Sequence, residues 1–361
     1  EQLNRTALKS HGLDSNGQLY KINSFEFYRY EDIIKKEDDA GYDKTAFEKM
    51  LEIKGDSDHT KLIDMLTDLN DYSIGIEDVL KEHFDEENIV YWMAFQILMG
   101  NVDTQNRNVY LYSPLNSDIW YFIAWDNDGC LMRPEYELRN FSDQNSWEKG
   151  ISNYWGNILF QRCLKSRSFR EKLNDAILDL REYLNKDMLT SKIESYKNVL
   201  KPYLYLMPDA EYEPLTSEQY DQIAASLPDE IEKNYQLYLE SLETPMPFYI
   251  GVPTIDGDKL KFNWDVSYDL DAEDITYSVE VAGDYLFRDV IYQNTTLTVP
   301  EAEMDLPKAG QYFVRVRATN TSGKTQDAFD YYVTDEGKYY GMRCFYITED
   351  STVEEDDYEE G

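Results

Sequence analysis

The residue types that can carry chemistry gather in one loop and at the end of a strand that follows it. The loop spans residues 100–108 and places Asp103 five residues before Asn108. Asp126 comes 23 residues after Asp103, and Asp128 lies two residues further on. Phosphoryl transfer uses these groups: one carboxylate takes up the proton of the attacking hydroxyl, and an amide with a second carboxylate holds Mg²⁺. The pattern therefore predicts a phosphoryl-transfer site.

The spacing of carboxylate and amide is that of the catalytic loop in ordinary protein kinases, where a metal-binding aspartate also follows a strand hairpin. Two differences exclude a routine eukaryotic-type kinase. Asn101 stands where such a kinase has the histidine of its His-Arg-Asp motif, and Asn127-Asp128 replaces the Phe-Gly after the metal-binding aspartate. Because Asp and Asn are common in turns, the loop spacing alone is a weak signal, and its neighbours must support it.

The elements on either side of the loop are suited to hold a buried site. Residues 91–99 are apolar almost all round, which predicts a helix inside a domain, ended by Gly100. Residues 109–112 and 120–125 have the composition of strands and are separated by a turn rich in Pro, Asn and Ser. We expect a strand hairpin that presents Asp126 at its end.

Helical periodicity surrounds this hairpin. Apolar residues spaced three and four apart predict helices within residues 43–99, and again over 160–184 and 217–242. The first 30 residues have the composition of loop and short strand, with a hairpin expected around residues 19–22. The first two thirds of the chain are thus predicted to be mainly helical.

A β-rich regime begins after Pro245-Met246-Pro247. The clearest strands are predicted over residues 259–264, 276–281 and 312–318. This part resembles a fibronectin type III or immunoglobulin-like β-sandwich. The resemblance is carried by Trp264 on an early strand, by Leu306 ahead of Gly310-Gln311-Tyr312, and by the alternating run before Asn320 and Gly323.

The chain is therefore expected to have an α+β organisation with three parts. A catalytic domain covers residues 1–244, a β-sandwich covers 245–347, and an acidic tail covers 348–361. Eight of the thirteen residues from 349 to 361 are acidic, so the tail is expected to be solvated and disordered or weakly ordered.

Composition excludes several classes of function. With 35 basic and 71 acidic residues the net charge is −36, which repels nucleic acid and anionic membranes. No run of 18 apolar residues exists, so no membrane span is expected. The three cysteines are far apart and lack CxxC spacing, and the three histidines are scattered, so zinc sites and a disulfide framework are not supported.

The loop, the aromatic strand and the segment after it resemble the spore coat protein H (CotH) kinase family. Members of that family carry a Gly-Asn-x-Asp-x(4)-Asn loop and a Trp-Asp-x-Asp segment, which are residues 100–108 and 125–128 here. The opening Glu1-Gln2-Leu3-Asn4 and the segment 17–21 are also similar to the family's Glu-Gln and Leu-Tyr-Lys segments. The resemblance covers roughly residues 1–240 and is strongest over 88–128.

This resemblance implies an atypical protein-kinase-like fold, with a mainly helical C-terminal lobe and a β-hairpin active site. It implies Asp103 as the catalytic aspartate, and Asn108 and Asp126 as ligands of the metal that bridges the ATP phosphates. Asp128 is expected as a further metal ligand and Lys21 as a nucleotide-binding residue. ATP and Mg²⁺ or Mn²⁺ are the expected cofactors.

The function implied is transfer of the ATP γ-phosphate to Ser or Thr of bacterial secreted or spore-coat proteins. A fibronectin-like appendage favours an extracytoplasmic location, by association. The same resemblance implies that Glu1 falls near the end of the nucleotide-covering lobe, so we expect that N-terminal lobe to be largely missing and the chain to derive from a longer precursor. The alternative is a non-catalytic surface or spore-coat module that binds proteins or polysaccharide, and metal-dependent nucleotide binding discriminates the two.

Overall fold

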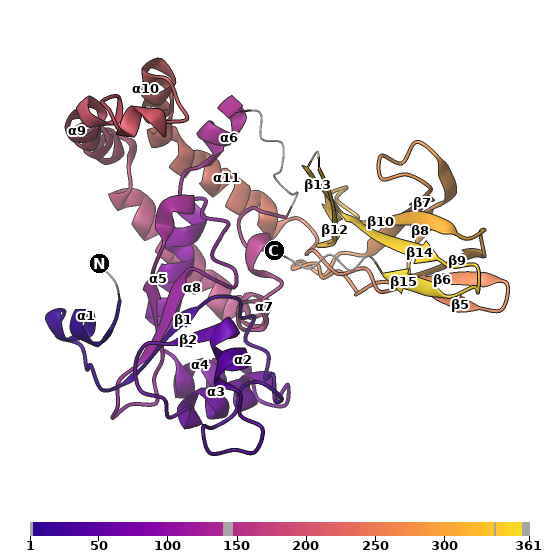
Figure 1. The fold of residues 1–361 in the computed structure, drawn as a ribbon, viewed down its shortest axis with the longest axis horizontal. Coiled ribbons are helices and arrows are strands. Elements are labelled where there is room, and N and C mark those ends of the chain that lie inside the picture. The colour runs from indigo at the N-terminus through magenta and orange to yellow at the C-terminus, as the bar shows by residue number, and fades with distance from the viewer. Residues whose placement is uncertain (1–2, 140–146, 336, 356–361) are drawn as a thin grey trace. The chain divides into compact units, whose positions relative to one another are not determined.

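The computed structural model describes residues 3–139, 147–335 and 337–355 (Figure 1). The chain divides into two compact units. The helical unit combines residues 1–140 with 153–238, and the β unit combines residues 141–152 with 239–361.

The helical unit contains a four-stranded antiparallel sheet. Its strands are β1 (Gln18–Ile22), β2 (Leu51–Ile53), β3 (Val109–Ser113) and β4 (Tyr121–Ala124). Their order is β2-β1-β3-β4, and Tyr20 on β1 lies opposite Leu111 on β3. The strand hairpin predicted over residues 109–112 and 120–125 is thus confirmed as β3 and β4.

The hairpin predicted within the first 30 residues is wrong. The segment before β1 forms the helix α1 (Arg5–Ser10), which begins where the Asn4 side chain accepts hydrogen bonds from the Thr6 and Ala7 amides at 2.8 and 3.1 Å. β1 pairs instead with β2 and β3 from distant parts of the chain. Four of its five residues are buried, and an isolated two-stranded hairpin cannot supply such burial.

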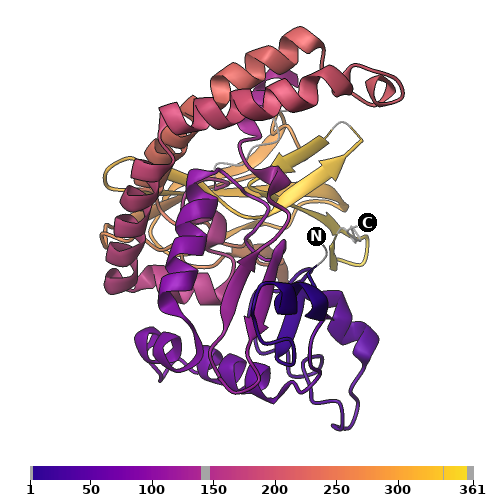
Figure 2. The ribbon, with the colours of Figure 1, turned by 90° about the vertical axis from the view of Figure 1, so that its left-hand side faces the viewer.

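Ten further helices follow among the residues that the structure describes. They are α2 (Lys44–Met50), α3 (Thr60–Asn70), α4 (Ile76–His83), α5 (Glu86–Leu98), α6 (Arg133–Arg139), α7 (Ile158–Lys165), α8 (Arg167–Tyr183), α9 (Lys186–Leu204), α10 (Ser217–Ser226) and α11 (Glu230–Leu242). The predicted helix over 160–184 is interrupted because Ser166 caps α8, its Oγ accepting from the Phe169 amide at 3.2 Å. The helix over 217–242 is interrupted by a 3₁₀ turn at Pro228. α9 and α10 lie side by side in both views (Figures 1 and 2).

α5 is the central helix that the apolar run predicts. Eight of its thirteen residues are buried, including Gln96. The helix contacts β4 and α8. Its Trp92 ring stacks on Phe160 at 5.5 Å between centroids and packs on Phe122 at 5.1 Å. None of the helices in the described parts of the chain is long and apolar enough to cross a bilayer.

The β unit consists of antiparallel strands. They are β5 (Thr254–Asp256), β6 (Lys259–Asn263), β7 (Ile275–Ala282), β8 (Val290–Leu297), β9 (Glu301–Asp305), β10 (Gly310–Asn320), β11 (Thr325–Asp327), β12 (Tyr331–Thr334), β13 (Gly337–Tyr340), β14 (Met342–Ile347) and β15 (Val353–Glu355). One sheet has the order β5-β6-β9 and another has the order β15-β14-β10-β7-β8, with β11 on β10. β12 and β13 form a separate hairpin. The three strands predicted here are confirmed as β6, β7 and β10.

The two larger sheets enclose one core. Leu260 and Phe262 of β6 belong to the same buried cluster as Val316 of β10 and Phe345 of β14. The Phe262 and Phe345 rings meet at 6.0 Å between centroids. The alternation of buried and exposed residues along β6 explains why this strand was recognisable in the sequence.

The first part of the predicted acidic tail is ordered, contrary to expectation. β15 pairs with β14, placing Glu355 opposite Phe345. Val353 packs on the sandwich core, and Glu355 accepts a hydrogen bond from Arg343 at 2.8 Å. Apolar packing and one ion pair therefore hold a segment that its charge alone marks as solvated. The rest of the predicted tail, residues 356–361, lies outside the described residues.

Candidate active site

Hydrogen bonds from distant segments hold the loop between α5 and β3. The Asn157 side chain donates to the Gln105 carbonyl at 2.9 Å, and the Asn153 side chain donates to the Val102 carbonyl at 3.2 Å. The Phe25 amide donates to the next carbonyl of the loop, that of residue 106, at 2.9 Å. Because loop carbonyls lack secondary-structure partners, these donors determine the path of the loop.

Asp103 and Asn108, predicted as catalytic and metal-binding residues, lie in direct contact. Asn108 Nδ2 donates to Asp103 Oδ2 at 2.7 Å, and Arg107 Nε lies 3.4 Å from Asp103 Oδ1. The Asp103 side chain is 49% exposed, so solvent can reach it. Partial burial raises the pKa of Asp103 above its ordinary value, although Arg107 and the hydrogen bond from Asn108 oppose the rise.

Asp126 and Asp128 lie just beyond β4, on either side of Asn127. Both are exposed, and neither carboxylate has a hydrogen-bond or ion-pair partner within the described parts of the chain. Their negative charges contribute to the raised pKa of Asp103, so the three aspartates share one electrostatic environment. The structure thus brings together the residues that the sequence separates by 23 positions.

The backbone is unusual at both predicted metal ligands. Asn108 has φ +57° and Asp126 has φ +52°, in the left-handed region that most side chains avoid. A third such residue nearby, Leu131, has φ +58° and donates its amide to the Met99 carbonyl at 2.8 Å. A left-handed backbone conformation costs energy at a residue other than glycine, so it persists only where surrounding contacts hold it. Such residues cluster at functional sites.

A buried amide network, missed in the sequence, joins the two loops through α5. Gln96 is fully buried; its Nε2 donates to Asn127 Oδ1 at 3.1 Å, and its Oε1 accepts from Asn101 Nδ2 at 3.0 Å. Asn101 Oδ1 in turn accepts from the Asp103 amide at 3.3 Å. A Cβ on Gly129 would lie 2.7 Å from Asn101 Oδ1, so a side chain at position 129 would require the Asn101 amide to shift. The available signal was a single polar residue, Gln96, within the otherwise apolar run of residues 91–99.

Arg107 is a second residue that sequence reasoning missed. Its half-exposed guanidinium lies beside Asp103, within a strongly acidic chain. Guanidinium groups bind phosphate oxygens well because they offer several N–H donors in one plane. The signal in the sequence was one cation within the polar loop.

Lys21 lies on β1, opposite Glu52 of β2 and Tyr110 of β3. Tyr110 is two residues along β3 from Asn108, and strand spacing and rise put the two Cα atoms of Lys21 and Asn108 on the order of 8 Å apart. A lysine side chain can span most of such a distance. Its contact with ATP stays a prediction.

The donor chemistry of the site fits a hard divalent cation. The described residues contain no group of three or more His, Cys, Asp or Glu side chains arranged to hold a metal. The predicted set is different, because it combines the Asn108 amide oxygen with the carboxylates of Asp126 and Asp128. Oxygen donors of this kind suit Mg²⁺ and Mn²⁺. Since Asn108 gives its amide nitrogen to Asp103, its oxygen remains the atom for a metal.

Comparison with known proteins identifies the first two thirds of the chain. A protein-family model described as CotH kinase protein matches residues 1–238. A search of curated proteins finds no match. The matched range includes the loop of Asp103 and the end of β4, and it stops before the first strand of the β unit.

Proposed function

This chain belongs to the CotH kinase family, and on that premise we propose that it is an ATP-dependent protein kinase acting on Ser or Thr side chains of secreted or spore-coat proteins. Membership implies an atypical kinase, and a kinase implies ATP as phosphate donor. The observation that carries the proposal is the hydrogen-bonded pair of Asp103 and Asn108, at 2.7 Å, in the shared field of Asp126 and Asp128.

Asp103 is proposed to act as the base. As the substrate hydroxyl oxygen bonds to the γ-phosphorus, the hydroxyl proton passes to the Asp103 carboxylate, the bond to the β-phosphate oxygen breaks, and ADP leaves. Burial raises the pKa of Asp103, which makes its carboxylate a stronger proton acceptor. The hydrogen bond from Asn108 and the proximity of Arg107 orient that carboxylate.

Asn108 and Asp126 would hold Mg²⁺ or Mn²⁺, with Asp128 as a further ligand. Such an ion, when bound, neutralises charge on the ATP phosphates. Arg107 and Lys21 are proposed to contact phosphate oxygens, because each places a cation near the loop of Asp103. In a chain with a net charge of −36, local cations are needed to attract a polyanion such as ATP.

We also propose that the β unit is a fibronectin type III-like sandwich. Its support is the all-antiparallel arrangement β5-β6-β9 against β14-β10-β7-β8, with Trp264 buried in the core. Such appendages are associated mostly with secreted bacterial enzymes, so an extracytoplasmic setting is proposed by association.

The experiment is phosphate transfer from γ-labelled ATP to dephosphorylated casein, with Mg²⁺ or Mn²⁺. Asp103→Asn is expected to lower the rate at least about 100-fold, the usual size of a lost general base. Asp118→Asn, at an exposed position in the β3–β4 turn, is the matched control and should leave the rate unchanged. Equal rates for wild type and Asp103→Asn would refute the role of Asp103.

Calorimetric titration of ATP with Mg²⁺ supplies the second arm. Asp126→Ala is expected to weaken metal-dependent ATP binding at least tenfold, because a carboxylate ligand is lost. If the wild-type chain neither binds ATP nor transfers phosphate, the kinase proposal fails. A non-catalytic module that binds proteins or polysaccharide would then be the better description.

A further inference from the structure

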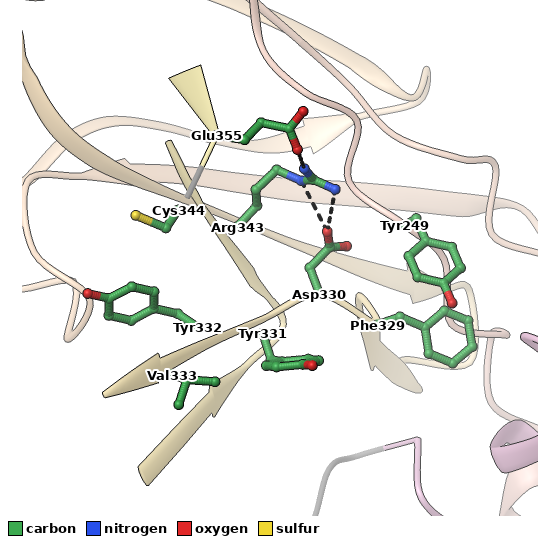
Figure 3. Close-up of a pocket in the computed structure, with 9 residues that line it drawn as sticks. All are labelled: Tyr249, Phe329, Asp330, Tyr331, Tyr332, Val333, Arg343, Cys344 and Glu355. Atoms are coloured by element: carbon green, nitrogen blue, oxygen red, sulfur yellow. Dashed lines mark hydrogen bonds and ion pairs between the residues drawn. The ribbon is translucent and has the colours of Figure 1, made fainter. Parts of the chain in front are cut away.

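The β unit contains a cavity of about 260 Å³ that the proposed kinase reaction does not use (Figure 3). Asp330, Arg343 and Glu355 form its charged side, and Tyr249, Phe329 and Tyr331 contribute aromatic rings. In Figure 3 Tyr331 lies on the opposite side of Asp330 from Arg343, and Tyr249 lies beside Phe329. The cavity thus has a charged side and an aromatic side.

The charged side is a fixed ion triad. The Asp330 side chain is 8% exposed; its Oδ2 accepts from the Ile250 amide at 2.7 Å, and its Oδ1 accepts from Arg343 Nε at 3.1 Å. Arg343 Nη1 donates to Glu355 Oε2 at 2.8 Å. Arg343 Nη2 also lies 3.1 Å from Asp330 Oδ1, so each terminal nitrogen of Arg343 faces one carboxylate and keeps a second N–H group to spare. Among the residues that the structure describes, Glu355 Oε1 has no partner. Donors and an acceptor are therefore presented side by side.

The aromatic side of the cavity is supported by further ring contacts. Tyr249 is half exposed, and its ring packs on Phe329 at 4.8 Å between centroids. Trp147 contacts the same Phe329 ring edge-on at 5.0 Å. This packing holds the Tyr249 ring in place, so it can present a fixed apolar surface.

Charge and hydrogen-bonding capacity exclude most kinds of ligand. An anion meets two carboxylates in a chain of net charge −36, and the guanidinium of Arg343 already occupies the place between those carboxylates that a cation would take. An apolar ligand would cover the spare groups of Arg343 and Glu355 without satisfying them, which is costly. A hydroxyl group can accept from Arg343 and donate to Glu355 at once.

From these features we propose that this cavity binds one ring of a neutral carbohydrate. Neighbouring hydroxyls of the ring bond to Arg343 and Glu355, and its C–H face packs on the Tyr249 ring. The volume of about 260 Å³ accommodates one ring rather than a long segment of polysaccharide, so specificity resides in a single sugar unit. The inference does not depend on the kinase proposal.

The test is electrophoresis of the full chain in native gels that contain a soluble polysaccharide, with xylan, mixed-linkage β-glucan, galactomannan and pullulan as probes. Wild type is expected to migrate more slowly in at least one gel. Tyr249→Ala and Glu355→Ala, both at half-exposed positions, are expected to weaken retardation at least tenfold. Tyr212→Ala, at a tyrosine 81% exposed in the helical unit, is the matched control and should behave as wild type.

Circular dichroism of each variant checks that the β unit remains folded. Because the ligand is neutral, raising NaCl from about 50 to 200 mM should leave retardation unchanged, unlike an ionic contact. Retardation in none of the four gels would overturn the proposal. Equal retardation of wild type and both cavity variants would overturn it as well, since binding would then lie elsewhere.

Discussion

At the scale of single residues, three amide side chains hold the loop of Asp103. Gln96, Asn101 and Asn127 bond to one another, and Asn101 accepts from the Asp103 backbone. Gln96 and Asn101 are almost fully excluded from solvent, where an unsatisfied amide is costly. The network therefore links the position of the proposed base to the loop of the proposed metal ligands.

Gln96→Leu should separate this positioning effect from general loss of stability. Leaving Asn101 and Asn127 without their partner should lower the free energy of unfolding by about 1–3 kcal/mol. Phosphate transfer should fall at least about tenfold at a temperature where the variant is fully folded. Gln222→Leu, at an exposed glutamine of α10, is the control and should change neither quantity. Normal transfer by folded Gln96→Leu would contradict the positioning role.

His59 makes the stability of the helical unit depend on pH. It is buried, stacks on Phe47 at 4.2 Å and hydrogen-bonds the Tyr20 hydroxyl at 2.7 Å. Burial lowers the pKa of His59, so the native state favours the neutral ring. As the pH falls below about 6.5, the His59 imidazole is protonated in the unfolded chain before it is protonated in the native state. The stability that the neutral buried ring contributes is therefore present above that pH and is lost below it.

Urea unfolding at pH 7.5 and 5.5 measures this effect. Wild type should lose more free energy of unfolding between the two pH values than His59→Gln, because only wild type has the buried imidazole to protonate. His11→Gln, at an exposed histidine, should retain the pH dependence of wild type. An identical loss in wild type and His59→Gln would show that other groups determine the pH dependence.

At the scale of elements, the end of α5 determines where the loop of Asp103 begins. Gly100 has φ +61°, and the Asn234 side chain of α11 donates to the Leu98 carbonyl at 2.8 Å. Asn234 also accepts from Arg133 at 2.5 Å. The helix thus ends by a left-handed glycine and by a cap from a segment 136 residues away.

Gly100→Ala tests this helix end. A Cβ there would lie 2.7 Å from Asn234 Nδ2, in addition to the strain of the left-handed backbone. We expect a loss of at least about 2 kcal/mol in urea unfolding. Gly12→Ala is the matched control: its φ is +73°, but nothing lies within 4 Å, so only about 1 kcal/mol should be lost. Equal losses would mean that the contact with Asn234 is readily relieved.

At the scale of the whole molecule, the chain forms two compact units with separate cores. Leu111 of β3 is fully buried in the helical unit, and Val316 of β10 is 1% exposed in the sandwich core. Separate cores allow separate unfolding, since two-state behaviour is expected of a unit and not of a multidomain chain.

Calorimetry of two core variants tests this independence. Leu111→Ala should lower the free energy of unfolding of one transition by about 2–5 kcal/mol and leave the other transition unchanged. Val316→Ala should lower the free energy of unfolding of the other transition only, by about 1–3 kcal/mol. A single transition that both variants shift alike would show that the units unfold as one.

The sequence by itself determined the features that depend on neighbouring residues. The apolar run predicted α5, alternation and turn residues predicted β3, β4 and the clearest strands of the sandwich, and spacing placed Asp103 and Asn108 in one loop. These features are readable because helix and strand periodicity and turn chemistry act over a few residues. Assignment of Asp103, Asn108, Asp126, Asp128 and Lys21 to their roles rests on the family resemblance and stays a prediction.

Only the tertiary structure decided what depends on residues far apart in the chain. It paired β1 with β2 and β3, attached β15 to the sandwich, joined Gln96 to Asn101 and Asn127, and assembled the cavity around Arg343. Each of these contacts joins a segment to a distant partner that cannot be identified from the sequence of the segment itself. A buried polar side chain or strand edge needs a hydrogen-bond partner, and in these cases the partner comes from a distant segment of the chain. Local sequence pattern cannot identify that partner, so only the tertiary structure determines which contact forms.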